Sequence, residues 1–84
     1  MQYKLKKSFK FGQETIAEVE IKEDFDAGDV ARVQNASKRG DGDAFIEILS
    51  IGTGFPAPKA SKIPAADAVE ISRLVTNFLN LGEN

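Results

Sequence analysis

The chain has 84 residues, enough for one domain and too few for a second hydrophobic core. It contains no cysteine and no histidine, which excludes disulfides, thiolate chemistry and the usual general base and metal ligand of neutral pH. No apolar run is long enough to cross a bilayer, and the first residues lack a signal-peptide core. We therefore expect a cytoplasmic protein with no membrane partner.

Charge is distributed unevenly along the chain, although the formal net charge is only −2. The first ten residues hold Lys4, Lys6, Lys7 and Lys10 and no acidic residue, whereas residues 14–29 are strongly acidic. One interpretation is a phosphate-binding patch of lysines. The other, which we favour, is that the lysines pair across a hairpin with the glutamates that follow.

Residues 2–22 are predicted to form an antiparallel β-hairpin. In the first half, apolar side chains occupy odd positions from Tyr3 to Phe11 and mostly alternate with lysines, as in a half-buried strand. In the second half, the odd positions Ala17, Val19 and Ile21 form the apolar face. Glycine at position 12 interrupts the pattern and indicates the turn.

The turn of this hairpin is expected to contain an odd number of residues, such as residues 12–14. A two-residue turn would place Leu5 opposite Glu20 and mix the polar and apolar faces. The odd turn keeps apolar residues opposite one another and places Lys6 opposite Glu20 or Glu18.

Residues 23–30 convert the strand pattern into a helical one. Asp26 is suited to be a helix N-cap, with Asp29 three positions later as the acidic partner of a capping box. Phe25 and Val30 have the spacing of a hydrophobic staple. The acidic run is therefore interpreted as a structural joint.

Three helices are predicted after the joint, at about residues 27–38, 42–51 and 64–81. The first helix is expected to turn Val30, Val33 and Ser37 inward, with Ala27 and Ala31 beside them. Together with the hairpin, these helices predict an α+β fold in a single domain, residues 1–84, with the helices packed on one face of the hairpin.

The ends of these helices are assigned from glycine, proline and aspartate. Gly40 is expected to follow the first helix, Asp41 or Asp43 to cap the second, and Gly52 to stop it. Residues 57–63 are expected to form a connector with at most one short helical turn. Pro64 suits the first turn of the third helix.

We find no catalytic, cofactor-binding or metal-binding constellation, so the chain is not expected to be an enzyme. Residues 24–29 resemble the start of a calcium loop, but the sixth and twelfth positions are Asp29 and Asn35 instead of glycine and glutamate. The glycines near Thr53 lack the spacing to lysine that a phosphate-binding loop requires.

The apolar stripe of the third helix has two interpretations that do not exclude each other. It supplies core residues, and it is also long enough to leave an exposed patch for a partner helix. The residues predicted to bind a partner are Leu74, Val75, Phe78, Leu79 and Leu81.

Three separated segments together resemble the small tail assembly chaperones of Mu-like and P2-like contractile-tailed phages. They are residues 3–7 with 16–22, residues 27–30, and residues 51–56 followed by Ile63, Asp67 and residues 75–79. The chain departs from the family pattern at Phe9, Phe11 and Pro64.

The resemblance implies a non-enzymatic phage or prophage protein, made in the bacterial cytoplasm and absent from the finished virion. Its implied partner is the tape-measure protein, a long helical client that is kept soluble until the tail tube protein polymerises around it. Many members of the family also have a longer form made by ribosomal frameshifting, which is a further implied partner. Neither a cofactor nor a nucleic acid is implied.

Two alternatives stay open from the sequence. The first is a small nucleic-acid-associated protein that uses the N-terminal lysines. The second is a minor structural protein of the phage tail.

Overall fold

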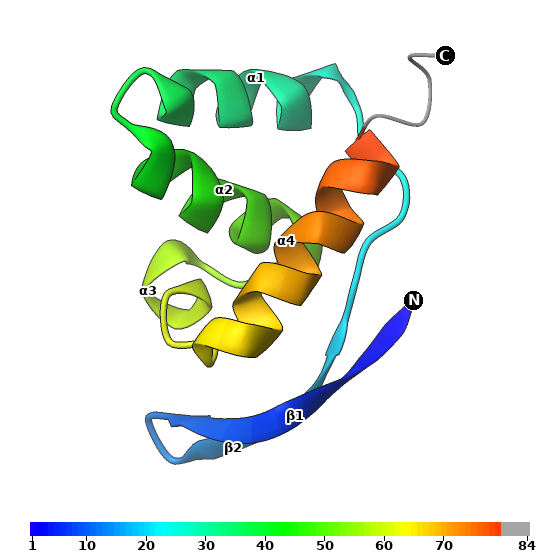
Figure 1. Cartoon of the computed structure of the whole chain (residues 1–84), viewed down its shortest axis with the longest axis vertical. Helices are drawn as coiled ribbons and strands as arrows, with labels where there is room; N and C mark the ends of the chain where they lie inside the picture. Colours follow the sequence, from blue (N-terminus) through cyan, green and yellow to red (C-terminus); the bar gives the residue numbers. More distant parts are fainter. Residues whose placement is uncertain (80–84) are drawn as a thin grey trace.

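The computed structural model describes residues 1–79, so the predicted helix end at Leu81 lies outside the described part. An N-terminal antiparallel hairpin is followed by helices, which confirms the predicted α+β class (Figure 1). The elements are β1 (Gln2–Phe11), β2 (Glu14–Glu20), α1 (Ala27–Ser37), α2 (Asp41–Thr53), α3 (Ala57–Ala60) and α4 (Ala65–Leu79).

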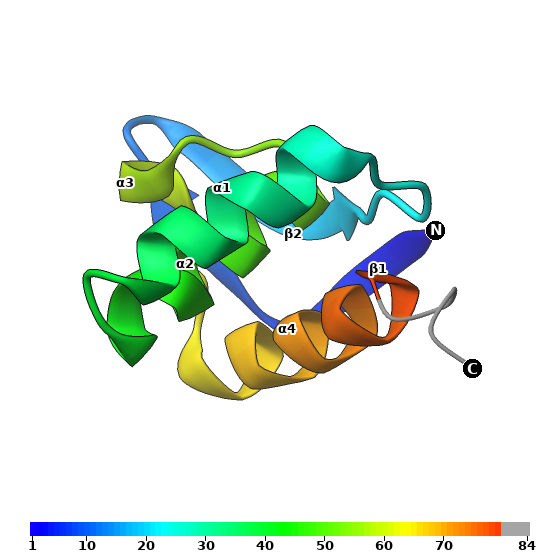
Figure 2. The same ribbon diagram turned by 90° about the horizontal axis from the view of Figure 1, so that it is seen from above.

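The helices lie to one side of the hairpin in layers (Figure 1). Helix α4 packs against both β1 and α2, while α1 packs on α2 and lies at the far end of the molecule from the hairpin. Seen from above, α1 lies over α2, and α4 runs beside β1 (Figure 2). Helix α4 is therefore the element that joins the hairpin to the other helices.

The core forms between the apolar face of the hairpin and the inner faces of α2 and α4. Ile21, Leu49, Ile71 and Val75 are almost completely buried at its centre. In β1, Leu5 is buried and the aromatic residues at odd positions are half-buried, so the predicted alternation of this strand is confirmed.

The predicted odd-numbered turn is wrong, because Phe11 pairs with Glu14 and leaves a two-residue turn. Gly12 in this turn has a φ of 64°, a conformation that glycine adopts without steric cost. The strand pairing is irregular between Lys4 and Phe9. This shift in register prevents the two-residue turn from placing polar residues opposite apolar ones. Beyond it, Tyr3 lies opposite Val19, so the apolar residues again face one another.

This irregularity also changes which charged residues face each other. Lys4, and not Lys6, lies opposite Glu18. In β2 the inward positions are Ile16 and Val19, while Ala17 is exposed. The predicted inward position of Ala17 is therefore wrong, because the strand changes face at the irregular segment.

Asp67 in the first turn of α4 stabilises the irregular part of β1. Its side chain is only 1% exposed. Its Oδ1 accepts hydrogen bonds from the Lys6 backbone N–H at 2.9 Å and the Tyr3 hydroxyl at 3.1 Å, and its Oδ2 accepts one from the Lys7 N–H at 3.2 Å. The carboxylate thus replaces the strand partner that these two amide groups lack.

Helix α1 begins as predicted but presents a different face to the core. Asp26 accepts a hydrogen bond from the Asp29 N–H, and its own N–H donates to the Asp29 side chain, which confirms the capping box. Val30, however, is 40% exposed. The buried positions are Asp29 and Ala36, so the predicted inward stripe led by Val30 is wrong.

Asp29 on the buried side of α1 takes part in an ion pair. Its Oδ2 lies 3.0 Å from the Lys22 Nζ, so this side of the helix faces the chain that leaves β2. Ala27, Ala31 and Ser37 are exposed, and of the predicted stripe only Val33 packs against the core.

Helix α2 is longer at both ends than predicted. It begins at Asp41 after Gly40, which serves as the N-cap without a side-chain hydrogen bond, so neither Asp41 nor Asp43 is the cap. Gly52 lies inside the helix, and the left-handed glycine that ends it is Gly54, with a φ of 77°. The short helical turn expected in residues 57–63 is confirmed as α3, and α4 begins directly after Pro64.

Candidate interaction surface

Val75, one of the predicted partner-binding residues, lies in the core of the molecule. It has no exposed surface. It packs against α2 at Gly52, where an added Cβ atom would lie 2.3 Å from the Val75 Cγ2. Val75 thus joins α4 to α2, and the prediction that it contacts a partner is wrong.

The other predicted residues are divided between two sides of α4. Leu74, Phe78 and Leu79 are half-buried and pack against the core, and Leu81 lies outside the described residues. Leu79 follows Leu74 by five residues, which places the two side chains about 140° apart around the helix. They therefore flank the buried ridge of α4 on opposite sides and do not form one patch.

The two sides of α4 face different elements. Leu74 follows Asp67 by seven residues, or about two turns, and so lies on the side that faces β1. Leu79 follows Ala68 by eleven residues, about 20° away around the helix, and so lies on the side that faces α2.

An apolar groove is present on the α2 side of α4, with a volume of about 300 Å³. Val69 is 61% exposed at this groove and is the most exposed of the large apolar side chains of the described residues. The apolar groove is lined by Phe45, Ile46 and Leu49 of α2, by Ala60, Ser61 and Ile63, and by Ala65, Ala68 and Val69 of α4.

The groove owes its width to small side chains. Ala60, Ala65 and Ala68 carry only a methyl group at the positions where α3 and α4 approach α2. Val69 was not among the residues predicted from the sequence to bind a partner. A valine directly beside a core alanine of an amphipathic helix is the signal that would have identified this edge.

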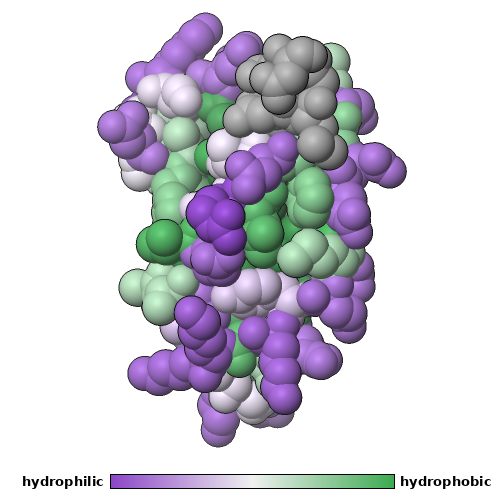
Figure 3. Space-filling view, turned by 45° about the vertical axis from the view of Figure 1, so that its right-hand side comes forward, coloured by the Kyte–Doolittle hydropathy of each residue, from purple (hydrophilic) through white to green (hydrophobic). Residues whose placement is uncertain are grey.

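The surface distribution of apolar groups agrees with the importance of α4. On the face in Figure 3, hydrophobic groups gather in the middle of the molecule, whereas the lower end, where the hairpin lies, is mostly hydrophilic.

A wider, open depression of about 780 Å³ lies between α1, the second half of α2 and the chain that leaves β2. The charged groups that line it form ion pairs with one another. Lys22 pairs with Asp29 at 3.0 Å, and the Met1 amino group pairs with Glu20 at 2.6 Å. Arg32 is likewise paired, with Glu47 at 2.6 Å. These ion pairs neutralise the charges that line the depression.

The two buried carboxylates are structural in character. Burial would raise the pKa of Asp67, but the backbone N–H groups of Lys6 and Lys7 and the Tyr3 hydroxyl hold that pKa below its usual range. Burial opposes ionisation of Asp29 too, and hydrogen bonds from Lys22 and the Asp26 N–H lower its pKa. Both groups are thus kept as anions, unlike a general acid.

Within residues 1–79, no cluster of three or more acidic residues is placed to hold a metal ion. No helix in that part of the chain is both long and apolar enough to cross a membrane. Comparisons with protein-family models, with curated proteins and with solved structures found no match to this chain.

Proposed function

We propose that this protein is a non-enzymatic tail assembly chaperone of a phage or prophage that holds a helical client in the apolar groove. In this proposal it acts in the bacterial cytoplasm, and the client is the tape-measure protein. A long helix with an apolar stripe aggregates when it is unpartnered, and a small domain that covers the stripe prevents this.

The observation that carries the proposal is the exposed apolar groove between α2 and α4. Helix-in-groove recognition needs apolar walls and a floor shallow enough for a helix to approach. Phe45 and Ile46 provide one wall, Val69 provides the other, and Ala60 and Ala68 leave the floor free of long side chains.

The proposed binding site lies nearer the start of α4 than the partner-binding residues that were predicted from the sequence. Leu79 lies on the same side of the helix as Ala68, but it is about three turns further along α4 and does not line the groove. Leu74 lies across the buried ridge from Leu79, and Phe78, which follows Ile71 by seven residues, lies along the ridge; both pack against the core.

The resemblance to tail assembly chaperones supports the choice of client. It also supports the tail tube protein, and a frameshifted longer form of the chain, as further partners. A gene placed between a tail tube gene and a very long tape-measure gene would agree with this assignment.

The test is co-expression with the tape-measure protein of the same genome, with the soluble fraction of the client as the readout. Val69→Asp places a charge in the groove without creating a cavity in the core. We expect it to reduce the soluble client at least about tenfold, since an unpaired charge at an apolar contact costs more than about 1.4 kcal/mol.

The matched control is Asn77→Asp, which adds the same charge at an exposed position of the same helix. It is expected to leave the client soluble. If Val69→Asp folds and still keeps the client soluble, the groove is not the binding site. If the unmodified chain does not solubilise the client at all, the chaperone assignment is wrong.

A further inference from the structure

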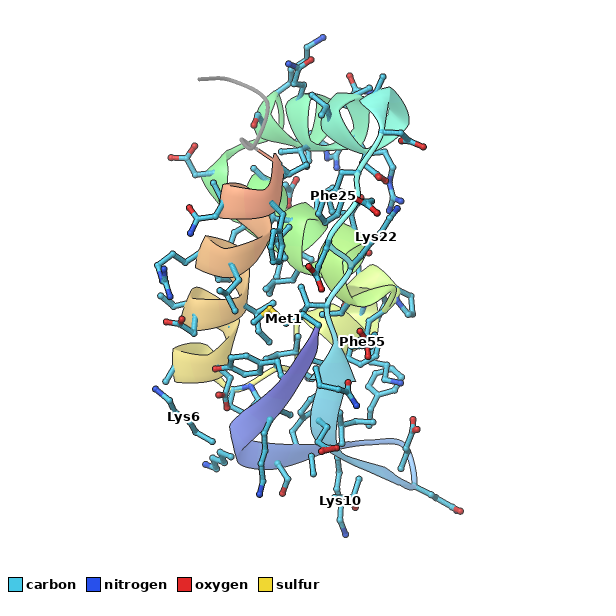
Figure 4. The ribbon with its side chains drawn as sticks, turned by 90° about the vertical axis from the view of Figure 1, so that its right-hand side faces the viewer. Met1, Lys6, Lys10, Lys22, Phe25 and Phe55 are labelled. Atoms are coloured by element: carbon cyan, nitrogen blue, oxygen red, sulfur yellow. The ribbon has the colours of Figure 1, made fainter. Side chains whose placement is uncertain are left out.

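Four lysines of β1 form an exposed basic face on the hairpin, which we call the lysine face: Lys4, Lys6, Lys7 and Lys10. All four are exposed, and the two apolar residues between them, Leu5 and Phe9, turn toward the core. In Figure 4, Lys10 lies at the end of the molecule opposite α1 and points away from the helices, whereas Lys6 lies beside the start of α4.

Two of the three glutamates of β2, which were expected to neutralise the lysine face, are engaged elsewhere. Glu14 pairs with Lys59 of α3 at 3.1 Å, and Glu20 pairs with the Met1 amino group at 2.6 Å. Among residues 1–79, none of the four lysines takes part in an ion pair. The predicted pairing across the hairpin is therefore wrong.

Three acidic side chains do lie close to this face, and one is Asp67, whose carboxylate accepts hydrogen bonds from the Lys6 and Lys7 backbone N–H groups. Glu18 is opposite Lys4 across the hairpin, and Glu70 of α4 is near enough to Lys6 to feel its charge, although Glu70 itself pairs with Arg73. Lys7 and Lys10 have no such neighbour in the register of the hairpin, where Lys10 faces Thr15. The lysine face thus keeps a net positive charge.

The irregular strand fixes this face in place. Lys6 and Lys7 are consecutive and both exposed, whereas a regular strand would direct their side chains to opposite faces. Their backbone N–H groups are both held by the buried Asp67 carboxylate, at 2.9 and 3.2 Å. The arrangement that displays both charges is therefore anchored to α4 and does not depend on a partner.

We propose that the lysine face binds the phosphate backbone of duplex nucleic acid without reading its sequence. All four cations are lysines, which contact phosphates as point charges and lack the forked geometry with which arginine recognises a base or carboxylate. This inference is independent of the chaperone proposal, since the lysine face belongs to β1, which contributes no residue to the lining of the apolar groove.

Other anionic partners fit this face less well. Stable binding to a membrane surface requires apolar side chains that enter the lipid. The exposed large apolar residues of the described chain are Met1, Val30 and Val69, and none belongs to residues 4–10. The same lack of exposed aromatic rings removes the stacking platform that single strands need.

A further acidic segment, which follows β2, lies away from the lysine face. The chain that leaves β2 carries Glu23, Asp24 and Asp26 around Phe25, and Figure 4 places Phe25 far from Lys10. Contacts to as many as four phosphates predict a dependence of log K on log salt with a slope of about −3.6.

The test is fluorescence anisotropy of the full chain with a labelled DNA duplex of about 20 base pairs, titrated at about 50 and about 200 mM salt. We expect binding at the lower concentration and a loss of about 100-fold at the higher one. The double variant Lys6→Gln with Lys10→Gln is expected to reduce the salt slope by about 1.8.

The matched control is Lys38→Gln with Lys62→Gln, which removes the same charge from exposed positions outside the hairpin. It is expected to bind as the unmodified chain does. An absence of binding at low salt, or an equal loss in both double variants, would overturn the proposal. Binding to polyglutamate without binding to the duplex would also overturn it, in favour of an acidic polypeptide.

Discussion

Helix α4 is held by two junctions of opposite character. On the β1 side, the buried Asp67 carboxylate accepts hydrogen bonds from an irregular strand. On the α2 side, Val75 packs directly against the backbone of Gly52, where no side chain fits. The first junction depends on charge and tolerates an irregular partner, whereas the second depends on shape and tolerates no added atom.

This difference accounts for the position of the apolar groove. Close approach of α2 and α4 at Gly52 fixes one end of the helix pair. Toward the start of α4, alanines replace larger residues, and the space between the helices stays open. The same helix therefore supplies a closed junction and an open one within about three turns.

The largest expected effect follows from removing the polar junction with Asp67→Ala. Three donors, from Tyr3, Lys6 and Lys7, would lose their acceptor, and we expect the free energy of unfolding to fall by about 3 kcal/mol. Denaturant unfolding measures the change. The control Asp41→Ala removes an exposed acid from the first turn of α2 and should cost only about 0.5 kcal/mol. Equal losses in the two variants would argue against the junction.

A smaller effect is expected at the apolar junction. Gly52→Ala would place a methyl group against Val75 and should lower the free energy of unfolding by about 2 kcal/mol. Gly42→Ala, in the same helix but with open space around it, should raise it by about 0.5 kcal/mol. Adding Val75→Ala should make Gly52→Ala less harmful, and strict additivity of the two changes would contradict direct contact.

The smallest expected effect is the pH dependence of the polar junction. Because the folded protein lowers the pKa of Asp67, its contribution to stability is fully present above the pKa of an unfolded aspartate, about 3.9. That contribution is lost as the pH falls through the lower folded value. The free energy of unfolding, measured by denaturant at several pH values across this range, should therefore fall more steeply with decreasing pH for the unmodified chain than for Asp67→Asn. Identical pH profiles would show that Asp67 does not titrate with folding.

The same two junctions show which features of the fold could be predicted from the sequence and which could not. Alternation in residues 3–11 identified the inward side chains of β1, and the capping residues Asp26 and Asp29 identified the start of α1. The irregular register could not be predicted from the sequence, because the group that stabilises it, Asp67, lies 61 residues from Lys6 along the chain. Gly52 was interpreted as a helix stop. Its actual role could not be inferred from neighbouring residues, because it depends on contact with Val75 of another helix.

The candidate surface was only partly predictable for the same reason. The stripe of α4 indicated which helix matters, and it included Leu79 on the side of the groove. It could not show that Val75 is enclosed by α2, or that Val69 is left exposed beside small residues of two other elements.

The central claim, that the groove between α2 and α4 receives the client helix, is tested most directly by methyl NMR of the complex with the tape-measure protein. We predict that the methyl groups of Ile46, Ile63 and Val69 show the largest changes on binding, while those of Leu74 are little affected. Changes confined to Leu74 and the hairpin side of α4, with Val69 unaffected, would contradict the claim.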